Sequence, residues 1–152
     1  MRKKPRNNCL RCGKEPARAG YIYCSNFCQQ EYQYESYLKK WLAGEVNGLQ
    51  GIGIVSNHVK RYLRRKFSNR CCLCGWAAIN PSLGYSPLVA DHIDGNWRNN
   101  IESNLRLICP NCDSLGSTYA GLNRGHGRGG RVLSKRAQQG RLFAQARREG
   151  PI

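Results

Sequence analysis

Acidic residues and long apolar segments are both scarce in this sequence. Only nine of its 152 residues are aspartate or glutamate, whereas 25 are lysine or arginine, so the formal net charge is +16. Such an excess favours a polyanionic partner over an acidic small molecule. Nucleic acid is the first candidate, because cations that neutralise phosphates release counterions. A basic surface that only faces water is the alternative.

The features of a secreted or membrane protein are also missing. No apolar run approaches the roughly 20 residues that span a bilayer, and no hydrophobic stretch follows the basic N-terminus MRKKPRNNC. We therefore expect an intracellular protein that is not secreted and has no membrane partner. No pattern indicates a small-molecule cofactor or a dimer interface, so we expect a monomer or a weak dimer.

Cysteine, by contrast, is abundant. Eight of the nine cysteines form four close pairs, and only Cys72 is left over; the pairs are Cys9 and Cys12, Cys24 and Cys28, Cys71 and Cys74, and Cys109 and Cys112. An odd number of clustered cysteines in a basic chain without a signal peptide fits a reducing compartment, where such pairs bind metal. A disulfide scaffold is the alternative.

The first two cysteine pairs predict a small zinc-binding module. A C-x2-C pair and a C-x3-C pair, separated by a turn-rich loop, can close a tetrahedron of four thiolates around one structural zinc ion. A helix should follow from Ser25 or Asn26, and one side of it should carry Phe27, Tyr34, Leu38 and Trp41. Gly44 should end this helix, so we assign residues 1–44 to the module.

Residues 45–68 are expected to form a linker and a basic helix. GEVNGLQGIGI is a glycine-rich connector, and SNHVKRYLRRKF predicts a helix capped by Ser56 with Val59, Leu63 and Phe67 on its apolar side. The other side is a candidate surface for a DNA backbone, and a solvated face is an equal alternative. Its cations are Lys60, Arg61, Arg64 and Arg65.

Residues 124–152 are predicted to be a basic, flexible C-terminal arm. This segment is rich in arginine and glycine and has a single acid, Glu149. Its glycine-rich first half cannot bury enough apolar surface to order itself before it meets phosphates. The candidate DNA-binding residues in it are Arg124, Arg128 and Arg131.

The chain's three aspartates, Asp91, Asp94 and Asp113, all lie between Ser86 and Ser114. There PLVADHI and LRLI predict two short strands, a polar loop with a DG turn connects them, and a helix should begin at the CPNC pair with Pro110 in its first turn. A second structural zinc ion would hold these elements together; its ligands would be Cys71, Cys74, Cys109 and Cys112. The expected fold class is therefore small, zinc-stapled α+β. A plain zinc ribbon is the alternative.

The order C-x2-C, DHIDGN, NL and CPNC, followed by one polar residue, resembles the HNH endonuclease family, which has the ββα-metal fold. The longer pattern CGW, DHIDGN, NNIESNLRLICPNC and STYAGLN is similar to phage and bacterial HNH proteins, some of which begin with a zinc-binding segment. The resemblance covers about residues 71–124, and we assign residues 69–123 to an HNH domain.

This resemblance implies roles for particular residues. His92 matches the general base, Asp91 a ligand of the catalytic metal, and Asn104 the asparagine that holds the loop and orients the histidine. Asp113 occupies a ligand position where the family usually has histidine or asparagine. Two carboxylate ligands should favour Mg²⁺ or Mn²⁺. Arg98 and Arg106 are candidate phosphate contacts.

The implied function is DNA endonuclease activity, in which one divalent metal and the histidine base hydrolyse a phosphodiester bond. The expected cofactors are two structural zinc ions and one catalytic Mg²⁺ or Mn²⁺. Because Asp113 departs from the family pattern, the alternative is a catalytically weak or inactive HNH-fold zinc protein that binds DNA in regulation or phage packaging. The resemblance places either protein in the cytoplasm of a bacterium or an infected host.

Overall fold

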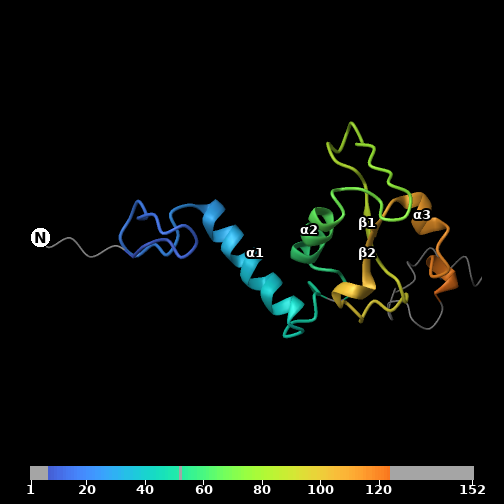
Figure 1. Ribbon diagram of the computed structural model, residues 1–152, viewed down its shortest axis with the longest axis horizontal. Helices are drawn as coiled ribbons and strands as arrows, with labels where there is room; N and C mark the ends of the chain where they lie inside the picture. Colours follow the sequence, from blue (N-terminus) through green and yellow to red (C-terminus); the bar gives the residue numbers. More distant parts are fainter. Residues whose placement is uncertain (1–6, 52, 124–152) are drawn as a thin grey trace, which may run out of the picture.

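Two helices precede a small antiparallel sheet, and a short helix follows it (Figure 1). The computed structural model describes residues 7–51 and 53–123, so the predicted arm at 124–152, with Arg124, Arg128 and Arg131, lies outside the described residues. The helices are α1 (Asn26–Leu42), α2 (Asn57–Lys66) and α3 (Pro110–Ser114), and the strands are β1 (Val89–His92) and β2 (Leu105–Ile108). Two 3-10 turns, η1 (Glu102–Asn104) and η2 (Ala120–Leu122), complete the elements. The protein is a small α+β chain.

Helix α1 begins where its sequence predicts. The Ser25 hydroxyl accepts a hydrogen bond from the Cys28 amide at 3.2 Å, and the helix ends at Leu42, just before Gly44 in a left-handed conformation. Tyr34 and Trp41 are buried as expected. The prediction for Phe27 is wrong, because its side chain is 62% exposed. The first turns of α1 extend beyond the core, and the Phe27 ring contacts the Arg11 guanidinium, 5.2 Å from its centre, instead of the core.

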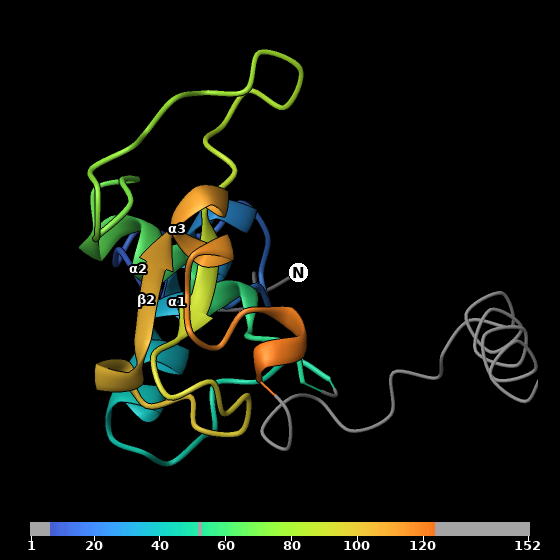
Figure 2. The ribbon, with the colours of Figure 1, turned by 90° about the vertical axis from the view of Figure 1, so that its right-hand side faces the viewer.

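Helix α2 packs on one face of the sheet. The Ser56 hydroxyl caps it by accepting from the Val59 amide at 3.2 Å, and Val59 and Leu63 are fully buried in a core that also contains Leu105 and Leu107 of β2. The strands pair antiparallel, with Asp91 opposite Arg106. Helix α3 contacts β1 and lies on the opposite side of the sheet from α2 (Figures 1 and 2).

The glycine-rich connector packs against the end of α1. Gly48 has a φ of +73°, and a Cβ at this position would lie 2.7 Å from the indole nitrogen of Trp41. That indole nitrogen donates to the Asn100 carbonyl at 2.8 Å. The C-terminal end of α1 therefore shares the core of α2 and the sheet, while the boundary between residues 44 and 45 stays a prediction.

Glu31 connects the first cysteine cluster, α1 and α2. Its side chain, on α1, is only 8% exposed and forms ion pairs with Arg61, with Arg65 at 3.9 Å and with Arg11 at 4.0 Å. The hydrogen bond from Arg61 is the main reason why the pKa of Glu31 lies below its usual value. No described helix combines the length and apolar composition needed to cross a bilayer.

Replacing Glu31 should therefore destabilise the protein. We expect Glu31→Gln to lower Tm at pH 7 by several degrees, because three arginines lose their common partner. Glu35→Gln is the matched control, since the Glu35 side chain is 56% exposed and within residues 7–51 and 53–123 pairs with Arg11 alone. Thermal unfolding of the zinc-loaded proteins tests this, and an equal or smaller loss in Glu31→Gln would contradict the connecting role.

Candidate functional site

The first four cysteines form one cluster in the structure. The ligand atoms of Cys9, Cys12, Cys24 and Cys28 all lie within 4.8 Å of one another. The sulfur of Cys24 is 3.5 Å from those of Cys12 and Cys28. Disulfide sulfurs would be about 2.05 Å apart, whereas ligands at about 2.3 Å in a tetrahedral zinc site are separated by about 3.8 Å. The cluster therefore fits a structural zinc ion.

The remaining predicted cluster joins two distant segments of the chain. Its ligand atoms, from Cys71, Cys74, Cys109 and Cys112, also lie within 4.8 Å of one another, and the sulfurs of Cys74 and Cys109 are 3.7 Å apart. The Cys109 sulfur additionally accepts from the Cys112 amide at 3.4 Å and so caps α3. Cys72 is exposed and does not take part in this cluster.

The electrostatics of both clusters favour a bound cation. Burial opposes ionisation of Cys71, but nearby backbone amides, first that of Cys74, outweigh it and lower its pKa to about 6. The pKa of Cys112 instead rises to about 12, chiefly because its thiol donates to Cys74 and Cys109. Cys9 and Cys24 show the same contrast, with pKa values of about 6 and about 12. Four thiolates can coexist in such a site only with a compensating cation.

The polar loop after β1 is held by Asp94 and Asn104. The Asn104 amide group donates to Asp94 at 2.8 Å and to the Asn99 carbonyl at 2.7 Å, and its oxygen accepts from the Asp94 backbone amide at 3.1 Å. Burial opposes ionisation of Asp94, yet hydrogen bonds from Asn99 and Asn104 lower its pKa overall. The network connects Asn104 to both Asp94 and Asn99 within the loop.

The contact to the His92 ring comes from a residue that the sequence reasoning did not select. His92 Nε2 lies 2.8 Å from the side-chain oxygen of Asn100, whereas the Asn104 side chain contacts Asp94 and Asn99 instead. Asn104 therefore holds the loop without bonding the ring directly. Asn100 is only 4% exposed.

The orientation of Asn100 determines the neutral tautomer of His92. The Asn100 amide nitrogen donates to the carbonyls of Trp97 and Arg98 at 3.1 and 3.2 Å, so the amide oxygen must face the imidazole. An oxygen at this position can only accept, and Nε2 must therefore carry the proton. This leaves Nδ1 of His92 as the nitrogen with a free lone pair.

Asp91 and Asp113 lie on the α3 side of the sheet. The Asp91 carboxylate accepts from Arg106 Nε at 2.7 Å. Burial raises the pKa of Asp113, the negative charge of Asp91 raises it further, and the charge of Arg106 partly offsets this effect. Two carboxylates that repel each other in a partly buried place match the oxygen ligands that Mg²⁺ and Mn²⁺ prefer.

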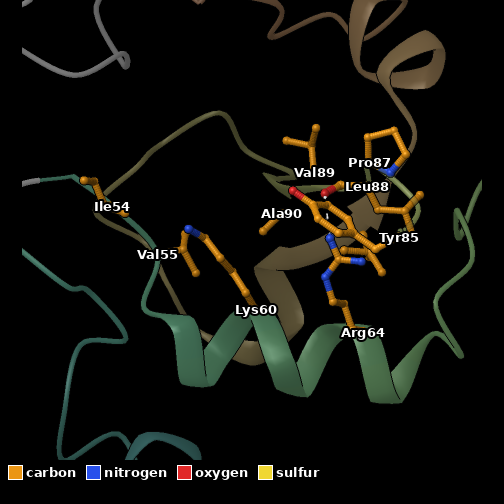
Figure 3. A pocket seen from close by; sticks show the side chains of 10 residues that line it. Ile54, Val55, Lys60, Arg64, Tyr85, Pro87, Leu88, Val89 and Ala90 are labelled. Atoms are coloured by element: carbon orange, nitrogen blue, oxygen red, sulfur yellow. Dashed lines mark hydrogen bonds between the residues drawn. The ribbon is translucent and has the colours of Figure 1, made fainter. Parts of the chain in front are cut away.

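The basic residues predicted to bind DNA have different environments. Arg61 and Arg65 pair with Glu31, and Arg64 donates to the carbonyls of Ser86 and Leu88 at 3.2 and 3.5 Å. Arg64 also lies beside Lys60 along a cavity of about 450 Å³ between α2 and β1 (Figure 3). Arg98 is exposed on the polar loop, with its guanidinium 4.9 Å from the centre of the Trp97 ring.

The zinc content of the protein should depend on particular cysteines. We expect two zinc ions per chain, one in each cluster, and the loss of one ion in Cys12→Ser or Cys74→Ser because a three-thiolate site binds zinc less tightly. Cys72→Ser should keep both ions and is the matched control. Native mass spectrometry measures this, and full zinc content in either ligand variant would argue against that cluster.

Comparison with known proteins found one informative similarity and two negative results. A 39-residue stretch is 54% identical to the H-N-H endonuclease F-TflIV of Escherichia phage T5, covering 26% of this chain and 17% of that protein. No protein-family model matches the sequence, and no solved structure matches the chain. A quarter of this chain is thus similar to part of an H-N-H endonuclease.

Proposed function

We propose that this protein is a metal-dependent DNA endonuclease of the H-N-H type, with a ββα-metal site formed by β1, β2 and α3. The observation that carries the proposal is the side-chain arrangement at the end of β1. His92 is held by Asn100 with Nδ1 free, and the neighbouring Asp91 lies on the same side of the sheet as Asp113. The partial similarity to a phage endonuclease supports the same reaction class.

His92 acts in this proposal as the general base. Its Nδ1 takes a proton from a water molecule that attacks the scissile phosphorus, and the hydrogen bond from Nε2 to Asn100 keeps the ring in place. An imidazole suits this step because its ordinary pKa of about 6.5 lies near physiological pH. The products would be a 3′-hydroxyl and a 5′-phosphate.

Asp91 and Asp113 would hold the catalytic divalent ion. When bound, Mg²⁺ or Mn²⁺ supplies Lewis-acid stabilisation of the negative charge on the phosphate and on the leaving 3′ oxygen. Three features support this assignment: the charge of Asp91 acts on Asp113, α3 contacts β1, and Cys112 of the second cysteine cluster is adjacent to Asp113. Arg98 and Arg106 are the candidate contacts to neighbouring phosphates.

A DNA-binding protein without turnover is the second candidate function. One observation favours it, the ion pair between Arg106 and Asp91. Arg106 already neutralises this carboxylate, which in an active endonuclease would bind the catalytic metal. Asp113, in place of the more usual histidine or asparagine, is compatible with either function. In this alternative the zinc clusters and basic residues would serve regulation or packaging.

Removal of the His92 imidazole should abolish most cleavage. We expect the native protein to nick supercoiled plasmid in Mg²⁺ or Mn²⁺ but not without added divalent ions, and His92→Ala to be slower by about 10²–10⁴-fold because the general base is missing. Both zinc ions and DNA affinity should be retained. Gel electrophoresis of plasmid and a filter-binding assay measure the two properties.

Two outcomes of this assay would decide against the proposal. Full activity in His92→Ala would exclude this residue as the base. Cleavage that appears only in an Asp113→His variant would mean that the carboxylate disables the site, and the second candidate function would then apply.

Asn100 should be needed for the correct tautomer of His92. In Asn100→Ala we expect kcat to fall by about 10–100-fold, the size of effect seen when a metal-ligating histidine loses its orienting hydrogen-bond partner, whereas KM should change little. Asn96→Ala is the control on the same loop, since among the described residues the Asn96 side chain accepts only from the Arg98 amide.

A spectroscopic readout separates positioning from a general structural role. The imidazole ¹⁵N chemical shifts of His92 should indicate the Nε2–H tautomer in the native protein and a mixture of tautomers in Asn100→Ala. Unchanged ¹⁵N shifts in that variant would contradict the role of Asn100.

A further inference from the structure

Arg106 neutralises a residue that the proposed site needs as a metal ligand. It lies directly opposite Asp91 in the antiparallel pair, and its Nε is 2.7 Å from Asp91 Oδ2. Both side chains are largely buried, with exposures of 22% and 16%. The pair is therefore better shielded from water than an ordinary surface ion pair.

The guanidinium and a divalent cation would compete for the same negative charge. Arg106 forms the ion pair with Asp91, and its charge also acts on Asp113, which has no ion pair among the described residues. A cation bound to Asp91 would repel Arg106, because both carry positive charge in a partly buried place. Metal binding should then favour a conformation in which the guanidinium leaves Asp91.

We propose that Arg106 couples metal binding to DNA binding. Without the divalent ion, Arg106 pairs with Asp91; when Asp91 and Asp113 bind the ion, the guanidinium is released and binds a phosphate of the DNA backbone. This inference rests on the proposed metal site. A guanidinium suits the second role because its planar donors match two phosphate oxygens.

Coupling of this kind must be reciprocal. If the ion increases the affinity for DNA by releasing Arg106, then DNA increases the affinity for the ion by the same factor. The guanidinium would also keep the two carboxylates partly neutralised in the absence of DNA, so that the ion binds weakly until a phosphate is available to receive Arg106.

The first arm of the test measures metal affinity without DNA. Zinc-loaded full-length protein is titrated with Mn²⁺, and free Mn²⁺ is followed by electron paramagnetic resonance. We expect Arg106→Gln to bind Mn²⁺ roughly three- to tenfold more tightly than the native protein, because the competing ion pair is gone. Arg106→Lys should lie between the two, and Arg98→Gln should change the affinity less because Arg98 stacks on Trp97.

The second arm measures DNA affinity with and without Mn²⁺, in a His92→Ala background that slows cleavage. Mn²⁺ should raise DNA affinity at least about fivefold when Arg106 is present. In Arg106→Gln the ratio of DNA affinities with and without Mn²⁺ should be smaller by a factor of at least about three. Arg98→Gln is the matched control. A fixed phosphate contact contributes equally in both conditions, so this substitution should weaken both affinities and leave their ratio unchanged.

The outcomes separate this inference from the proposed function. Equal Mn²⁺ affinity in the native protein and Arg106→Gln, or an undiminished Mn²⁺-dependent gain in that variant, would overturn the coupling while the metal site remained. If no zinc-loaded variant binds Mn²⁺, Arg106→Gln included, both the metal site and the coupling would be overturned. Zinc content and circular dichroism establish that each variant is folded.

Discussion

The second cysteine cluster is the constraint on which the site depends. It joins the turn after α2 to the junction of β2 and α3 through Cys71, Cys74, Cys109 and Cys112. Helix α3 has only five residues and none is buried, so neither its own hydrogen bonds nor a packed face can hold it in place. Structural zinc sites supply about 10–16 kcal/mol. With zinc bound in this cluster, the position of Asp113, next to Cys112, would depend on the metal more than on the core.

Hydrogen bonds, rather than apolar packing, determine the rest of the site. Asp94 accepts from the side chains of Asn99 and Asn104 and from the Asn96 amide, and Asn104 closes the loop back onto its own start. Asn100 forms a separate set of hydrogen bonds, to the His92 ring and to the Trp97 carbonyl, and these orient the ring. A loop with little buried apolar surface can thus hold an imidazole in one tautomer, which is the requirement for a general base.

The sequence predicts the local features of the fold well, because short-range chemistry determines them. Ser25 and Ser56 cap their helices, the two strands occur where expected, and the cysteine spacing leads to two clusters. Features that depend on distant partners were not predictable. Exposure of Phe27 depends on where the core ends, and the choice of Asn100 over Asn104 as the partner of His92 depends on how the loop folds. The adjacent asparagines at 99 and 100 were a signal, but spacing alone did not indicate which side chain faces the ring.

The arginines of α2 bind other parts of the protein, unlike those of a helix whose basic side chains are all free to contact DNA. In α2, Arg61 and Arg65 pair with Glu31, and Arg64 binds backbone carbonyls. Arg61 and Arg65 therefore connect α1 to α2, while Arg64 connects α2 to the segment that leads into β1. Trp41 adds a second connection, from the end of α1 to the loop that carries Asn100. Both connections act on one continuous helix, so α1 is joined both to α2 and to the loop that orients His92.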